Sequence, residues 1–165
     1  MDNELDRVCT EIGRYRPVPW DQIPDLGLYM DQVITFITRV YEPLYGDSTK
    51  RYLSAPMINN YVKNKLIPRP SGKKYSRLQI SLLIMIVALK QVCMMEDIRI
   101  MLQAESEEEI QTLYERFCER QTQALQEMLA RQRQLAPAID CAIIASAYRA
   151  GCECMLGTDS EDPVQ

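Results

Sequence analysis

The sequence lacks histidine altogether, and with it the most common general base of enzymes and a frequent metal ligand. It also lacks a glycine-rich phosphate-binding loop, and the acidic run at 107–109 is explained as negative charge at the start of a helix. These absences argue against catalysis. We therefore expect a protein that is not an enzyme, with no catalytic residue, bound metal or cofactor.

Large aromatic side chains are scarce as well, with two Phe and one Trp, whereas Leu, Ile, Met, Ala, Gln and Glu are abundant. This composition favours helices over strands, so we expect a mainly α fold, and 47% apolar residues suffice for a core. The N-terminus shows no basic region followed by an apolar core, as a signal peptide would. The longest uninterrupted apolar run extends only from Leu82 to Leu89, which is too short to span a membrane. The sequence thus predicts a cytoplasmic protein with no membrane partner.

Acidic residues are missing from one long segment, 48–95, although the whole chain carries a net charge of −4. Basic residues in that segment are Lys50, Arg51, Lys63, Lys65, Arg69, Lys73, Lys74, Arg77 and Lys90. A basic patch without interspersed acids attracts polyanions such as nucleic acid. The alternative is an ordinary solvated basic face.

The six cysteines are irregularly spaced, which argues against a disulfide framework and for reduced thiols. Cys152 and Cys154 are two residues apart near the end of an expected helix, where their side chains would lie on different faces. We expect incidental thiols there, and the sequence leaves open whether either has a redox or metal role.

The amino-terminal half predicts an arm followed by a helix. In residues 1–25, prolines at 17, 19 and 24 surround Trp20, so we expect a loosely held arm with a weak first helix, docked on the core by Trp20. Apolar residues at helical spacing then predict a helix from Asp25, its expected cap, to about Glu42, where Pro43 and Gly46 would stop it.

The basic segment predicts a short helix, a loop and a long helix. Ser54 is placed to cap the short helix, whose exposed side would carry Asn59, Asn60, Lys63 and Asn64. In the basic loop that follows, two prolines limit flexibility and Gly72 permits a tight turn. Ser76 would cap the next helix, which is apolar nearly all round and is the expected centre of the core, and a further short helix is expected at 95–104.

The carboxy-terminal part predicts two further helices. Ser106 and the acidic residues after it form a capping pattern that opens a helix to about Leu135. Pro137 would start a final helix, 138–155, before a disordered tail at 157–165. We assign 105–156 to dimerisation or effector binding.

The run Met57-Ile-Asn-Asn-Tyr-Val-Lys-Asn-Lys-Leu-Ile-Pro, followed by Lys74-Tyr-Ser-Arg-Leu-Gln-Ile, resembles the MerR-type winged helix-turn-helix. Met94-Met-Glu-Asp-Ile-Arg-Ile-Met-Leu is similar to the helix that closes that domain. The runs that start at Pro19, Tyr29 and Pro56 are similar to an uncharacterised bacterial family, catalogued only as a domain of unknown function. That second likeness covers residues 19 to about 150.

The MerR-type resemblance implies a winged helix-turn-helix domain at 26–104, followed by long carboxy-terminal helices. Helix 57–64 would present Asn59, Asn60 and Lys63 to the major groove of double-stranded DNA. A wing at 68–75 would place Arg69, Lys73 and Lys74 on the phosphate backbone. The remaining implied DNA-binding residues are Tyr61 and Tyr75, by hydroxyl contact or packing, and Lys50, Arg51 and Arg77, by charge.

Two residues depart from the MerR pattern. Asn59 stands where the pattern usually has Arg, so the pattern gives little guidance on base preference at this position. Lys65 stands where a glycine usually ends the helix. Because Asn tolerates the left-handed conformation better than Lys, we expect Asn64 to take that turn position.

Two functions follow as hypotheses. The first is a sequence-specific, DNA-binding transcriptional regulator that forms a homodimer through helix 106–135. The second is a non-catalytic protein-interaction module on the same scaffold, whose basic patch would meet an acidic protein surface. In addition, helices 106–155 could enclose an apolar pocket for a small-molecule effector of unknown identity.

Overall fold

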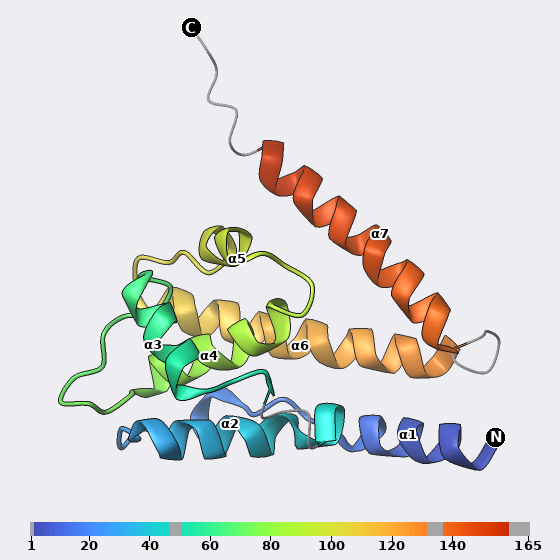
Figure 1. The fold of residues 1–165 in the computed structure, drawn as a ribbon, viewed down its shortest axis with the longest axis horizontal. Helices are drawn as coiled ribbons and strands as arrows, with labels where there is room; N and C mark the ends of the chain where they lie inside the picture. The colour runs from blue at the N-terminus through green and yellow to red at the C-terminus, as the bar shows by residue number, and fades with distance from the viewer. Residues whose placement is uncertain (1, 47–50, 132–136, 159–165) are drawn as a thin grey trace, which may run out of the picture.

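The structure is a computed structural model that describes residues 2–46, 51–131 and 137–158. These residues form seven α-helices and one short 3-10 helix, and no named strand, so the expected mainly α class is confirmed (Figure 1). The elements are α1 (Asp2–Arg14), η1 (Trp20–Gln22), α2 (Met30–Tyr45), α3 (Ala55–Lys63), α4 (Arg77–Leu89), α5 (Met95–Met101), α6 (Glu107–Arg131) and α7 (Pro137–Thr158).

Helix α4 is the centre of the core, as its apolar sequence predicted. Every residue from Gln79 to Val87 is buried, and α4 packs against both α2 and α6 (Figure 1). Ser76 precedes the helix as its N-cap, and its backbone N–H donates to Oε1 of Gln79 at 2.6 Å. The side-chain nitrogen of the buried Gln79 also has a hydrogen-bond partner, because its Nε2 donates to the carbonyl oxygen of Pro68.

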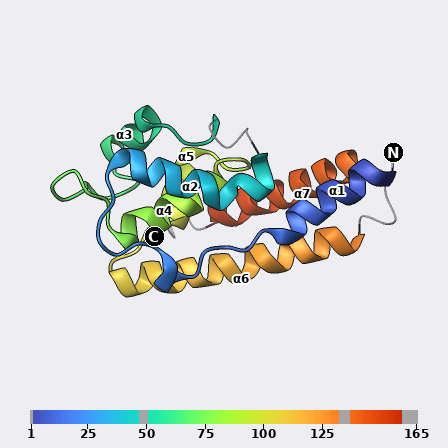
Figure 2. The same ribbon diagram turned by 90° about the horizontal axis from the view of Figure 1, so that it is seen from below.

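The amino-terminal segment is more firmly held than the loosely attached arm that the prolines suggested. Helix α1 runs along α6 and contacts α2 near the end of that helix (Figure 2). Tyr15 and Ile23 are buried, and the ring of Trp20 lies 6.0 Å from that of Tyr114. The prolines therefore limit helix length without preventing this segment from contributing to the core.

Helix α2 begins and ends later than predicted. Asp25 is not its cap; the helix starts at Met30 after Tyr29, because Leu28 is held in an extended pairing with Tyr75 by two backbone hydrogen bonds of 2.8 and 2.9 Å. Pro43 does not stop the helix, which continues to Tyr45. The ring of Tyr45 packs 4.8 Å from that of Tyr52, a tertiary contact that offsets the cost of proline in the last turn.

The two long carboxy-terminal helices diverge in a V (Figure 1). Ser106 caps α6 as expected, since its Oγ accepts the N–H of Glu109 at 3.2 Å. The expected end near Leu135 lies outside the described residues. The disordered tail was expected to begin at Gly157, but α7 includes that residue and ends at Thr158. The remaining residues, 159–165, lie outside the described part of the chain. In the described ranges, we find no helix with the length and apolarity needed to cross a membrane.

Candidate nucleic-acid interface

Helix α3 has one buried and one exposed side. Ser54 occupies the N-cap position in extended backbone, but its side chain does not make the capping hydrogen bond that the sequence suggested. Pro56 is accommodated in the first turn, and Ile58 and Tyr61 face the core. Asn59, Asn60 and Lys63 are exposed, as the sequence predicted. The amide oxygen of Asn60 accepts a hydrogen bond from Asn64 at 3.0 Å, so its acceptor is already engaged.

The end of α3 corrects the prediction for Asn64. Asn64 has φ −85°, and Lys65 takes the left-handed conformation with φ 58°. The N–H of Lys65 donates to Val62 and that of Leu66 donates to Tyr61, which together form a Schellman motif. Because Leu66 must reach the core, these bonds require the reversal at position 65 whatever residue occupies it.

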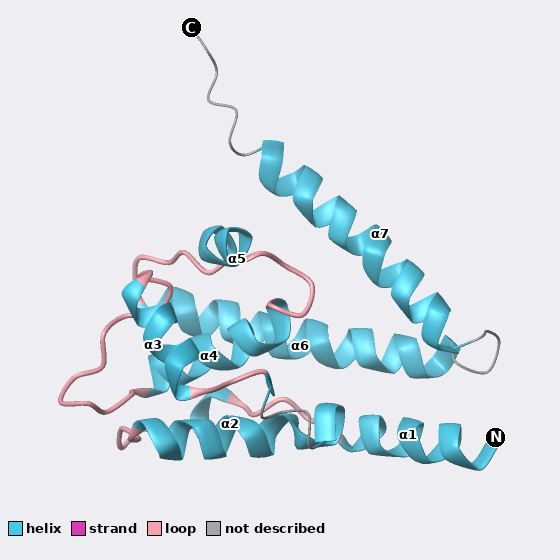
Figure 3. Ribbon diagram, in the orientation of Figure 1, coloured by secondary structure: helices cyan, strands magenta, loops and turns pink. Residues whose placement is uncertain are grey.

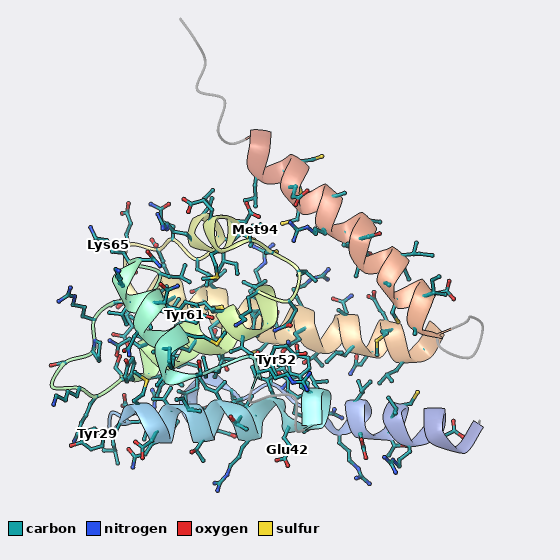
Figure 4. The ribbon with its side chains drawn as sticks, in the orientation of Figure 1. Tyr29, Glu42, Tyr52, Tyr61, Lys65 and Met94 are labelled. Carbon is teal, nitrogen blue, oxygen red and sulfur yellow. The ribbon has the colours of Figure 1, made fainter. Side chains whose placement is uncertain are left out.

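Lys65 belongs to the basic segment but was not among the expected DNA-binding residues. Its left-handed conformation could have been predicted, because the MerR pattern usually has a glycine at this position. Its side chain is exposed and extends away from the end of α3 (Figure 4). The charge of Lys65 thus adds to that of Lys63 on the same surface.

The loop between α3 and α4 projects from the body of the molecule (Figure 3). At its tip Ser71 pairs with Lys74, while Gly72 and Lys73 have φ 54° and 64°. Positive φ at both central residues is the signature of a type I′ hairpin turn, so the tight turn expected at Gly72 is confirmed. Arg69, Lys73 and Lys74 are exposed, and Nζ of Lys74 lies 5.3 Å from the ring centre of Tyr29.

Tyr61 and Tyr75 do not belong to the exposed interface. Both are buried, with 4% and 3% of their surface accessible, so of the two roles left open, packing is the one observed (Figure 4, Tyr61). Burial raises the pKa of both phenols. The hydroxyl of Tyr61 accepts a hydrogen bond from Nζ of Lys90, whose pKa burial lowers. Lys90 is therefore also an internal contact rather than part of the basic surface.

Arg77 is likewise occupied within the fold. Its Nε donates to the carbonyl oxygen of Ile23 at 3.0 Å, and its guanidinium lies 3.7 Å from a carboxylate oxygen of Asp25 and 5.9 Å from the ring centre of Trp20. These contacts fasten the segment before α2 to the start of α4, which explains why Arg77 is only partly exposed. Arg51 is exposed, and Lys50 lies outside the described residues.

Acidic residues approach this surface from a distant part of the sequence. A groove of about 760 Å³ separates the end of α3 from the connection between α5 and α6. Lys63, Lys65 and Arg69 line one part of it, whereas Glu105 and Glu107 line another. The absence of acids from 48–95 therefore does not make this side of the molecule uniformly basic. The loop tip at Lys73 does not line this groove.

A second groove, also of about 760 Å³, lies between α6 and α7 and is mainly apolar. Its lining includes Met85, Leu89, Met101, Phe117, Met128 and Ile144. Within the described ranges no cluster of three or more Cys, Asp or Glu residues is arranged to hold a metal ion.

Comparison with known proteins gives one result. The family model described as a domain of unknown function (DUF1836) matches residues 18–117, which include η1, α2 to α5 and the first part of α6. No curated protein and no solved structure matches the chain. The match covers more than half of the sequence and bears out the likeness to an uncharacterised family. This chain therefore belongs to the DUF1836 family, a family whose function is unknown.

Proposed function

We propose that this protein is a DNA-binding transcriptional regulator of the winged helix-turn-helix type, with α3 as the helix in the major groove and residues 68–75 as the wing. One observation carries the proposal. The exposed residues Asn59, Asn60 and Lys63 of α3 and the basic loop between α3 and α4 lie at the same end of the molecule (Figures 1 and 2).

The residue types suit the two parts of such an interface. The width of the major groove admits an α-helix, and Asn can form paired hydrogen bonds with adenine there. Since the acceptor of Asn60 is already engaged, Asn59 is the better candidate for base contact. Arg69, Lys73 and Lys74 would contact phosphates, and the hairpin turn at 72–73 holds them on a short, defined projection.

The conformation of Lys65 supports the resemblance to the MerR type. The MerR pattern usually has glycine at this position, and here the backbone is left-handed, a conformation that glycine adopts without steric cost. The capped start of α4 at Ser76, directly after Tyr75, also agrees with the pattern.

The acidic residues near α3 limit where DNA would be held. Glu105 and Glu107 would repel phosphates beside Lys65, so we place the main backbone contact at the loop tip, around Lys73 and Lys74. It follows that replacing Glu105 and Glu107 together by Gln should strengthen binding to all DNA sequences at low salt.

A homodimer belongs to the proposal because two copies would double the contact with DNA. The apolar side of α6 is largely used within the chain, however, since Ile110 and Tyr114 are buried and α6 packs on α1 and α4. A dimer contact within 106–135 would therefore need the other side of α6. Light scattering of the purified protein, with and without DNA, measures whether two copies associate.

The test is selection from random double-stranded DNA, performed at low and at physiological salt because phosphate contacts depend on ionic strength. We expect an enriched site. Lys73→Ala with Lys74→Ala should weaken binding to every sequence and reduce the salt dependence, whereas Asn59→Ala should change the preferred sequence.

The matched control replaces two exposed arginines of α1 and α2, Arg7 and Arg39, by Ala, which removes the same charge from other helices. This variant should bind DNA much as the parent does. Failure to retain DNA even at low salt, or equal weakening by the control and the loop variant, would contradict the proposal.

The apolar groove between α6 and α7 favours a second candidate function, a protein-interaction module. Tyr148 of α7 is exposed and lines this groove, so it would take part in such a docking surface. The same groove would suit a small apolar effector. Salt-insensitive binding to a protein, with no retention of DNA, would favour the module over the regulator.

A further inference from the structure

Two cysteines from different parts of the chain meet where α7 contacts the body of the protein. Cys93 lies in the connection between α4 and α5, and Cys152 lies near the end of α7. The thiol of Cys152 is a neighbour of that of Cys93 and, after burial, is a further cause of the raised pKa of Cys93. The sulfur of Cys152 also lies 4.0 Å from that of Met101, which fixes its position against α5.

A neighbouring contact holds the same face of α7 against the same connection. Arg149, one turn before Cys152 and on the same face, donates a hydrogen bond to the carbonyl oxygen of Val92. Val92 directly precedes Cys93. Arg149 and Cys152 thus set the register of α7 against residues 92–93, so the approach of the two sulfurs does not rest on a single side-chain rotamer.

Cys154 provides a contrast on the same helix. It is exposed, and the spacing of two residues directs its side chain to a different face from that of Cys152. The cysteine nearest to Cys152 in the sequence, Cys154, is therefore not the one that the fold brings near it.

We propose that Cys93 and Cys152 form a reversible disulfide when the protein meets a thiol oxidant such as glutathione disulfide. A disulfide has an S–S bond of about 2 Å. Because α7 is already held against Val92 and Met101, the two neighbouring thiols need only a local movement to form it. The bond would link α7 to the α4–α5 connection.

The exchange has two steps. The deprotonated thiol of Cys152 attacks one sulfur of glutathione disulfide, forms a mixed disulfide and releases one glutathione thiolate, which takes up a proton. Deprotonated Cys93 then attacks the protein sulfur of that mixed disulfide and releases the second glutathione. The protein loses two protons and two electrons, and one glutathione disulfide becomes two glutathione molecules. We assign the first attack to Cys152 because burial raises the pKa of the Cys93 thiol.

The consequence concerns the groove between α6 and α7. Residues of α7, including Ile144 and Tyr148, form one side of this groove. A covalent link at Cys152 would hold that side in place, whereas the reduced protein holds it by noncovalent contacts alone. Oxidation would therefore stabilise the groove in the form described, independently of whether the protein binds DNA.

The experiment treats the full-length, reduced protein with glutathione disulfide, blocks the remaining thiols and digests the product with trypsin. We expect a disulfide between peptides 91–99 and 150–165, and an intact protein lighter by two hydrogen atoms. Because peptide 150–165 contains both Cys152 and Cys154, Cys152→Ser and Cys154→Ser form the decisive matched pair. The first should abolish the link and the second should retain it.

Circular dichroism of both variants and of Cys93→Ser checks that each is folded. In the parent, oxidation should raise the midpoint of thermal unfolding, and a thiol reductant should reverse the shift. The proposal is overturned if glutathione stays attached to Cys93 or Cys152 without a cross-link, or if the link persists in folded Cys152→Ser.

Discussion

The hydroxyl group of Tyr114 donates a hydrogen bond of 2.7 Å to the carbonyl oxygen of Val18. Tyr114 is fully buried in α6, and Val18 lies in the connection between α1 and η1. The bond therefore joins segments that are far apart in the sequence. It also gives a donor to the carbonyl of Val18, which lies outside the helices and accepts no hydrogen bond within one. It shows how a proline-interrupted segment can still be part of the core.

Tyr114→Phe should lower the free energy of unfolding by about 1–2 kcal/mol, because it removes this donor and leaves the carbonyl of Val18 with only the weak thiol contact of Cys118 at 3.8 Å. Urea unfolding followed by circular dichroism measures the change. The control is Tyr148→Phe, which removes a hydroxyl that is 74% exposed and should change stability little. Equal effects of the two substitutions would contradict the assigned role of the bond.

Gly27→Ala should destabilise the protein by about 1–2 kcal/mol, the cost of placing an L-residue in the left-handed region. Gly27 has φ 69°, and an added Cβ would lie 3.2 Å from Cβ of Lys74, beside the Leu28–Tyr75 pairing. Gly151→Ala is the matched change in a helix, where an added Cβ meets nothing within 4 Å, and should stabilise by roughly 0.5–1 kcal/mol. Thermal unfolding of both variants measures the contrast, and a stabilising Gly27→Ala would disprove the described turn.

Lys65→Gly should stabilise the protein by about 1 kcal/mol, since glycine takes the left-handed conformation of this position without strain. Lys63→Gly removes the same charge two residues earlier, at the end of α3, and should destabilise because glycine is a poor helix former. Chemical unfolding of the pair separates backbone strain from charge. A loss of stability in Lys65→Gly would mean that Asn64, as first predicted, occupies the turn.

The fold should unfold cooperatively in alkali. Burial raises above 10.0 the pKa values of six phenols: Tyr15, Tyr41, Tyr45, Tyr61, Tyr75 and Tyr114. A raised pKa means that the folded state holds the proton more tightly, so this contribution to stability is complete below pH 10.0 and is lost as the pH rises above it. Lys90 acts in the opposite direction. Because burial lowers its pKa, its contribution to the stability of the folded state increases as the pH rises. It is, however, one group against six.

Ultraviolet absorbance of tyrosinate and circular dichroism, measured together during a titration with alkali, test this expectation. These six phenols, five buried and Tyr45 half-buried, should ionise together with the loss of helical signal. Ionisation of every tyrosine while the helical signal stays unchanged would show that these side chains are accessible in the folded protein.

Several features of the fold and of the candidate interface follow from local sequence. The caps at Ser76 and Ser106 were predictable because each serine contacts a residue three positions later along the chain. The exposed side of α3 followed from helical spacing, and the turn at Gly72 from the freedom of glycine in φ. Such features depend on neighbours within a few residues, so the sequence alone contains their causes.

Other assignments depended on residues distant in the sequence. Arg77 was expected on the DNA-binding surface, but Ile23 and Asp25 engage its guanidinium. Tyr61 was a candidate for DNA contact, yet its hydroxyl meets Lys90 in the interior. A tyrosine or arginine beside a basic run has the same sequence pattern in either role, and only the packing of other segments decides which side chain remains exposed.

The sequence by itself determined the helical class, the central place of α4, the caps and the outward face of α3, because helix propensity, apolar spacing and capping act locally. Only the tertiary structure decided that Tyr15 and Ile23 are buried in the core, that Glu105 approaches the basic residues after α3, and that Cys93 lies near Cys152. The physical reason is that these contacts arise when buried apolar surfaces bring separate helices together, and that arrangement is not encoded in any short stretch of the chain.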